Sequence, residues 1–141
     1  MSGPDVVVDT NVFVSARNRH ERGYPACRKL IDRIDAGEFR AIISAITIAE
    51  LRTSFSPEEV RTVWRAALSH FLTSSNYRVE PVAVDIADSA GELRAASHLT
   101  LPDAIVVATG QLRGASRLFT QDSELARRQS VLAVKSPDEL V

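Results

Sequence analysis

The sequence contains very little cysteine, histidine or lysine, which limits the sites that this chain can form. Among its 141 residues Cys27 is the one cysteine, so a single chain can form neither an internal disulfide nor a multi-thiolate metal site. The three histidines, His20, His70 and His98, lack the paired spacing of an imidazole-based zinc centre. Any metal ion would therefore have to be held by oxygen.

Long apolar runs are also absent. No segment approaches the ~18 uninterrupted apolar residues of a membrane span. Hydrophobic residues at 45% and charged residues at 25% are ordinary for a globular protein. An acid at Asp5 and strand-like residues from Val6 leave no room for a signal peptide. We therefore expect one soluble domain over residues 1–141, located in the cytoplasm and not bound to a membrane.

Segments of strand-like and helix-like sequence alternate along the chain. Short β-branched runs between turn formers predict strands, and a 3.6-residue apolar period predicts helices. The predicted strands cover residues 5–8, 40–44, 78–82, 117–120 and 131–134. The predicted helices cover 25–36, 57–72, 85–98 and 102–112, with one beginning where the second strand ends at Ser44 and a short one following Asp122. This alternation predicts an α/β fold with a mostly parallel sheet covered on both faces.

The helix predicted over residues 57–72 carries an apolar stripe from Val60 to Leu72. Trp64 and Phe71 are its largest side chains, and large aromatic side chains are common at the centres of interfaces. The stripe is compatible with core packing, with a dimer interface and with a groove for a partner helix.

Four acids lie where predicted strands end or predicted helices begin. Asp9 ends the first strand, Glu50 lies in the helix after the second, Asp103 lies at the head of an apolar helix, and Asp122 follows the fourth strand. In a parallel sheet these positions share one edge, so the carboxylates can converge. Clustered carboxylates repel unless a cation lies between them, and all-oxygen ligands favour Mg²⁺ or Mn²⁺. An ion of this kind activates water and polarises a phosphodiester, which predicts a hydrolytic nuclease centre.

Each acid also has a structural interpretation. Glu50 and Asp103 each follow a threonine at the spacing of a capping box, and Asp9 and Asp122 could each cap the helix that follows. Capping requires no apolar flanks, however, and burying acids beside apolar segments is costly unless they are paired or bind a metal. Taken together, the four acids favour a metal site.

The motifs around these acids resemble the PIN domain family, and within it the VapC-type ribonuclease toxins of bacterial toxin-antitoxin pairs. They are V-D-T-N-V at 8–12, I-A-E-L at 48–51, L-P-D-A-I at 101–105 and T-x-D at 120–122. The resemblance implies a three-layer α/β/α sandwich whose five-stranded sheet has the order 3-2-1-4-5. It also implies a catalytic site formed by Asp9, Glu50, Asp103 and Asp122.

The resemblance further implies endonucleolytic cleavage of RNA that depends on Mg²⁺ or Mn²⁺. Asp9 and Asp103 would be direct metal ligands, Glu50 would hold the ion or orient the water, and Asp122 would act directly or through water. The implied partners are a small VapB-type antitoxin, lying in a groove of the helical layer, and a second copy of the chain in a homodimer. The apolar stripe is the candidate for part of that groove or for the dimer face.

Two polar groups near these motifs have open roles. Asn11 and Thr120 are candidates for positioning water or phosphate, although both are also turn formers beside strand ends. Arg17, Arg19 and Arg22, in the polar stretch after Asp9, are candidates for phosphate contacts or parts of a solvated loop.

The sequence departs from the family pattern after Asp122, where Leu125 stands at a position that is often aromatic. Three other functions compete with the nuclease. A phosphatase of the haloacid dehalogenase type would need a second aspartate where this chain has Asn11, and a nucleotide-binding module would need a glycine-rich phosphate loop, which is absent. A catalytically silent PIN-like domain that binds RNA or a protein remains the alternative from another class.

Overall fold

The computed structural model describes residues 3–140, in which five strands form one parallel sheet in the order β3-β2-β1-β4-β5. The strands are β1 (Asp5–Val8), β2 (Arg40–Ser44), β3 (Tyr77–Glu80), β4 (Leu118–Phe119) and β5 (Val134–Lys135). The predicted α/β class and strand order are confirmed. Because the order reverses between β1 and β4, a crevice is expected at their carboxyl ends.

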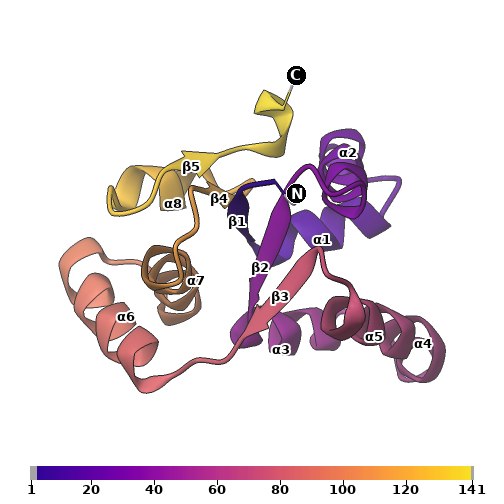
Figure 1. Ribbon diagram of the computed structural model, residues 1–141, viewed down its shortest axis with the longest axis horizontal. Helices are drawn as coiled ribbons and strands as arrows, with labels where there is room; N and C mark the ends of the chain where they lie inside the picture. Colours follow the sequence, from indigo (N-terminus) through magenta and orange to yellow (C-terminus); the bar gives the residue numbers. More distant parts are fainter. Residues whose placement is uncertain (1–2, 141) are drawn as a thin grey trace.

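Helices cover both faces of this sheet and make three layers (Figure 1). Side chains alternate along β1, so Val6 and Val8 join one buried cluster while Val7 joins the other. The first cluster is covered by α1 (Thr10–Arg17), α2 (Tyr24–Asp35), α3 (Ala45–Thr53) and α5 (Arg65–Thr73), and the second by α6 (Val84–Ser97), α7 (Leu101–Leu112) and α8 (Ser123–Arg128). No helix in the described range is long and apolar enough to cross a membrane.

The segment predicted as one helix over 57–72 contains a turn of π-helix. It begins at α4 (Pro57–Glu59), where the Ser56 hydroxyl accepts from the Glu59 amide and the Glu59 carboxylate accepts from the Ser56 amide. The π-turn η1 (Val60–Trp64) follows and leads directly into α5. The chain ends, within the described residues, on the 3₁₀ turn η2 (Pro137–Glu139).

The last predicted strand, over 131–134, was placed wrongly. The strand is Val134–Lys135, and the apolar Leu132 before it packs into the second cluster from a loop. The reason is a side chain: the Gln129 amide accepts from the Leu132 N–H at 3.0 Å and donates to the Leu132 carbonyl at 2.9 Å. With both backbone groups already bonded, Leu132 has none left for a strand ladder.

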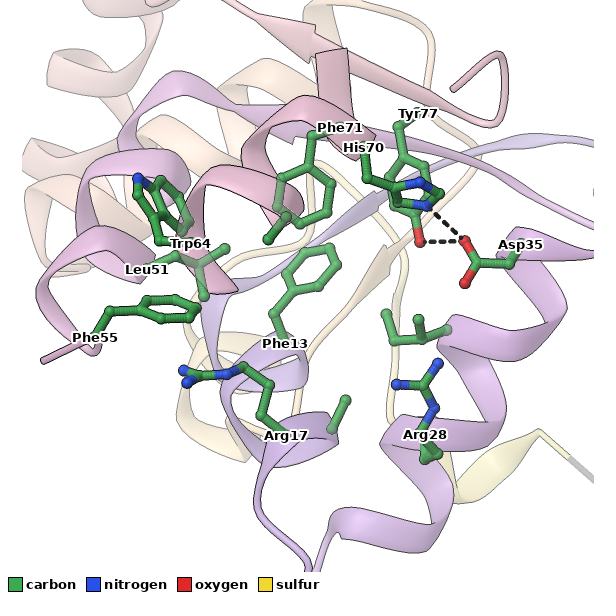
Figure 2. A pocket seen from close by; sticks show the side chains of 13 residues that line it. Phe13, Arg17, Arg28, Asp35, Leu51, Phe55, Trp64, His70, Phe71 and Tyr77 are labelled. Carbon is green, nitrogen blue, oxygen red and sulfur yellow. Dashed lines mark hydrogen bonds and ion pairs between the residues drawn. The ribbon is translucent and has the colours of Figure 1, made fainter. Parts of the chain in front are cut away.

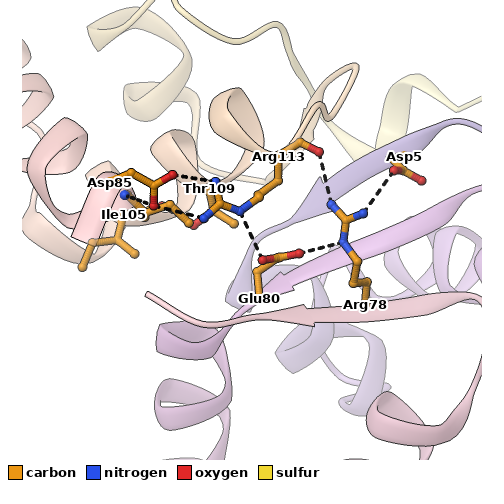
Figure 3. A network of polar contacts seen from close by, with 8 residues as sticks. Asp5, Arg78, Glu80, Asp85, Ile105, Thr109 and Arg113 are labelled. Atoms are coloured by element: carbon orange, nitrogen blue, oxygen red, sulfur yellow. Dashed lines mark hydrogen bonds and ion pairs between the residues drawn. The ribbon is translucent and has the colours of Figure 1, made fainter. Parts of the chain in front are cut away.

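A chain of ion pairs ties the α6–α7 pair to the sheet (Figure 3). Arg78 on β3 pairs with Glu80 at 2.9 Å and with Asp5 on β1 at 3.8 Å. Arg113, at the end of α7, pairs with Glu80 at 3.3 Å and with Asp85 in the first turn of α6 at 2.8 Å. Each exposed pair contributes little energy by itself. Together, however, the pairs join the end of α7, the helix that carries Asp103, to β3 and to the start of α6.

Gly110 lets α7 approach β1 closely. A Cβ atom at Gly110 would lie 3.4 Å from Val7 Cβ and 2.6 Å from Leu132 Cδ2. Glycine inside a helix costs roughly 1 kcal/mol relative to alanine. Gly91, on α6, has nothing within 4 Å of the corresponding position.

These two helical glycines should therefore respond oppositely to added side chains. Gly91→Ala should raise the free energy of unfolding by roughly 0.5–1 kcal/mol, because only helix propensity changes. Gly110→Val should lower it by about 1–3 kcal/mol through overpacking against Val7 and Leu132. Urea unfolding followed by circular dichroism measures both, and a stabilising Gly110→Val would contradict this packing.

Candidate active site

Asp9 lies at the end of β1 and caps α1. Its side chain is 6% exposed. The Thr10 amide donates to its Oδ1 at 2.8 Å, and the Thr120 hydroxyl and the Asn11 side-chain amide donate to its Oδ2 at 2.8 and 3.3 Å. Three donors thus hold the carboxylate in one orientation at the point where the strand order reverses.

This burial makes ionisation of Asp9 costly. Desolvation raises the pKa of Asp9 to about 6, hydrogen bonds from Thr120 and Thr10 partly oppose that rise, and the charges of Asp103 and Glu50 add to it. Both of the other acids are therefore near enough to repel a charge on Asp9. A cation beside these groups would relieve the repulsion.

Glu50 is oriented by α1, although it lies on α3. The Thr10 hydroxyl donates to Glu50 Oε1 at 2.6 Å, and the hydroxyl of the buried Thr47 lies 3.4 Å from that of Thr10. The capping-box interpretation of Glu50 is wrong, because α3 begins at Ala45 and its cap is the Ser44 side chain. Glu50 therefore has no role in ending or starting a helix.

Asp103 and Asp122 complete the predicted set from the other side of the sheet. Asp103 lies in the first turn of α7, where its amide donates to the capping Thr100 hydroxyl at 3.3 Å. Desolvation raises the pKa of Asp103, and the charges of Asp122 and Glu50 raise it further. Asp122 caps α8 through Oδ1, which accepts from the amides of Glu124 and Leu125. For Asp9 and Asp122, the capping interpretation is confirmed.

All four predicted acids line one open cavity of about 480 Å³ at the carboxyl ends of β1 and β4. The cavity is lined by Asp9, Thr10, Asn11, Val14, Ser15, Glu21, Glu50, Asp103, Gln121 and Asp122. Five of these are carboxylates, and within the described residues no lysine, arginine or histidine lines the same cavity. The lining is chemically suited to a cation.

The fifth carboxylate, Glu21, was missed by the sequence analysis. It accepts a hydrogen bond from the Ser15 hydroxyl, which in turn accepts from Gln121 Nε2 at 2.8 Å. Gln121 needs the space beside Gly23, because a Cβ atom there would lie 1.9 Å from its Oε1. No motif or period marks Glu21, which lies in the loop between α1 and α2.

Asn11 and Thr120, whose roles the sequence left open, both donate to the Asp9 carboxylate. Asn11 also donates to the Thr120 hydroxyl at 3.0 Å, and its Oδ1 accepts from the Gln121 amide at 3.1 Å, which fixes the direction of its side chain. Arg17 is engaged elsewhere: its guanidinium lies 3.6 Å from the centre of the Phe55 ring.

Comparisons with known proteins agree with this geometry. The sequence profile of the PIN domain matches residues 6–130. The chain belongs to the PIN domain family. None of the curated proteins matches it by sequence.

Solved structures resemble this PIN domain over most of their length. A toxin-antitoxin complex from Klebsiella pneumoniae contains a chain that is 23% identical, with a TM-score of 0.70 over 94% of this chain and 97% of that one. FitAcB from Neisseria gonorrhoeae is 19% identical, with a TM-score of 0.69 over 96% and 99%. VapC20 of Mycobacterium tuberculosis, a toxin that cleaves the sarcin-ricin loop, is 20% identical, with a TM-score of 0.66 over 86% and 93%. At these identities the likeness shows the fold.

The site of this PIN domain fits a divalent ion that keeps part of its water shell. Within residues 3–140, no three His, Cys, Asp or Glu side chains are grouped closely enough to hold one ion together. Mg²⁺ is usually held by one or two carboxylates and several waters, so it does not need such a group. The oxygen donors, the mutual repulsion of the acids and the absence of bases in the lining all suit this kind of binding.

Without divalent ions, the free energy of unfolding should fall as the pH rises from about 4 to about 6. In that window the folded chain keeps a proton on Asp9, whose pKa burial raises to about 6, while the unfolded chain releases it. The full effect is about 3 kcal/mol. Urea unfolding in a chelator at several pH values measures it. Asp9→Asn should lose this part of the slope, and equal slopes in both proteins would contradict the burial argument.

Proposed function

We propose that this chain is a divalent-metal-dependent endoribonuclease that hydrolyses RNA phosphodiesters. The observation that carries the proposal is the cavity at the end of β1, which is lined by carboxylates and by no base among the described residues. The four acids named from the sequence are its catalytic residues. The fold shared with a toxin that cleaves the sarcin-ricin loop supports RNA as the substrate.

We assign each of the four acids a role according to its burial and its hydrogen bonds. Asp9 and Asp103 would bind Mg²⁺ or Mn²⁺ directly: both line the cavity, and burial raises the pKa of each, so a nearby cation would stabilise both charges. The bound ion would lower the pKa of a water molecule and offset charge on the phosphate. Glu50, which the Thr10 hydroxyl holds in place, would orient that water. Asp122 caps α8 through Oδ1 and would contribute to the site directly or through water.

The nuclease proposal predicts that purified protein cuts RNA with Mg²⁺ or Mn²⁺ and not in a chelator. Asp9→Asn and Asp103→Asn should each lower the cleavage rate by at least about 100-fold, because direct ligands to the ion are lost. Glu139→Gln, an acid outside the cavity, is the control and should cut normally. Gel analysis of a labelled RNA measures all four proteins.

Undiminished cutting by both site variants would contradict the metal mechanism. RNA binding without cutting by the wild type would instead favour the catalytically silent alternative. Circular dichroism of each variant separates loss of chemistry from loss of fold.

We also propose that the chain is the toxin of a toxin-antitoxin pair, works in the cytoplasm as one domain and forms a homodimer. The fold it shares with chains of toxin-antitoxin complexes supports this role. Exposed apolar side chains of the predicted stripe, Val63 at 48% and Leu72 at 63%, would be covered by a second copy.

A second cavity, of about 290 Å³, is the candidate groove for the VapB-type antitoxin (Figure 2). The predicted stripe contributes Trp64, Ala67 and Phe71 to its wall. Trp64 and Phe71 are also buried in the core, so for these two residues the core interpretation is confirmed. Figure 2 shows Phe13, Phe55 and other apolar side chains turned toward this space, with Arg17, Arg28 and Asp35 at its margin. An amphipathic helix suits a groove of this character.

Expression of the wild type should arrest growth, and an antitoxin encoded beside the gene should relieve the arrest. Ala67→Arg places a long side chain in the groove and should abolish relief while leaving the toxicity itself unchanged. Ala66→Arg is the matched control, because Ala66 is exposed and does not line the groove. Growth curves with co-expressed antitoxin measure both. Equal relief of the two variants would contradict the placement of the antitoxin.

A further inference from the structure

Among the described residues, no lysine, arginine or histidine lines the acidic cavity. The cavity therefore offers no basic side chain to bind the phosphates of an RNA strand. A metal ion would neutralise the phosphate that reacts, but the phosphates on either side of it remain charged. Proteins hold such phosphates with arginine or lysine. The substrate strand should therefore leave the cavity toward a base.

Two smaller cavities adjoin the acidic one, and they differ in charge. One shares Gln121 and Asp122 with it and is lined further by Glu139, with no lysine, arginine or histidine among its described lining. The other, of about 200 Å³, shares Asp103 and Asp122 with it. We call this second space the α7–α8 pocket, lined by Leu99, Thr100, Asp103, Asp122, Glu124, Leu125 and Arg128. Arg128 is the one base in this lining.

Two contacts hold the Arg128 guanidinium in place and leave some of its N–H groups without a partner among them. Its Nη1 donates to the His98 carbonyl at 3.0 Å, and its Nε lies 3.3 Å from Glu124 Oε2. His98 has a φ of 60°, the one positive φ of a non-glycine residue in the described range, and this conformation ends α6. A guanidinium has five N–H donors, so three remain for a ligand. The side chain is 49% exposed, so a ligand can reach it.

Three carboxylates, those of Asp103, Asp122 and Glu124, line the pocket together with Arg128. Glu124 also pairs with Arg127, so its carboxylate is shared between two guanidinium groups. Asp103 and Asp122 lie on the wall shared with the acidic cavity, where the proposed ion would bind. The Thr100 hydroxyl accepts from the Asp103 amide, and its hydrogen bond to the Asp103 side chain lowers the pKa of that carboxyl.

We propose that the α7–α8 pocket binds the nucleotide next to the scissile phosphate, with Arg128 contacting that nucleotide's phosphate. The inference rests on the proposed RNA cleavage and adds the direction in which the strand leaves the acidic cavity. The pocket's volume of about 200 Å³ leaves no room for more than one nucleotide unit.

The experiment compares Arg128→Ala with Arg127→Ala. Both arginines lie in the last turn of α8 and pair with Glu124, but Arg127 lines neither cavity. In a chelator, binding of a fluorescent single-stranded RNA should weaken about tenfold in Arg128→Ala, and the salt slope should fall by about one. In Arg127→Ala the RNA affinity should stay within about twofold of the wild type, and the salt slope should not change. With Mn²⁺, Arg128→Ala should raise KM with kcat nearly unchanged, since an interaction of uniform strength is lost.

Two further variants separate charge from local structure. Arg128→Lys keeps the charge and should recover part of the binding, whereas Arg128→Gln can still donate to the His98 carbonyl and should not. Equal binding by the Ala variants at positions 127 and 128, or rescue by Gln and not by Lys, would overturn the subsite. If the wild type fails to cut RNA while the difference between the Ala variants in binding persists, the nuclease proposal falls and the subsite stands.

Discussion

The structure of the candidate site depends on one buried carboxylate, that of Asp9. It lies under the start of α1 at the end of β1, with three hydrogen-bond donors around it and almost no contact with solvent. Its pKa is raised because burial makes the charged form of the carboxyl less stable than it is in water. The surroundings of Asp9, from the Thr120 hydroxyl to the amide of Asn11, are arranged to hold that charge in one orientation.

The alternation of strands and helices predicted the parallel α/β fold, the resemblance to PIN domains implied the order of its strands, and the strand ends placed the four acids at one edge of the sheet. An apolar run that ends on an acid marks a strand end, and parallel strands bring their ends together. The sequence was insufficient where a single side chain decides the outcome. Gln129 bonds both backbone groups of Leu132 and so moves the last strand. Glu21 lines the cavity from a loop, where the Ser15 hydroxyl donates to its carboxylate, and no spacing rule predicts that contact.

Helix α1 contributes to both of the larger cavities. Asn11 and Ser15 on one side line the acidic cavity, while Phe13 and Arg17 on the other line the apolar groove. Because α1 has only eight residues, the two surfaces lie within two turns of each other along the same backbone. A partner seated in the groove would rest on the helix whose first residue, Thr10, orients Glu50.

Asp9 and Asp122 are helix caps as well as proposed catalytic residues, and this affects how relatives of this chain can lose activity during evolution. Each side chain caps the start of a helix. In a family member that no longer cuts RNA, substitution of either residue would still weaken a helix cap, so selection for folding would retain both. The Glu50 side chain caps nothing, and among the described residues its one side-chain hydrogen bond is to Thr10. Among descendants that have lost the chemistry, position 50 should therefore diverge before positions 9 and 122, and comparing it with them would help to tell active from silent PIN domains.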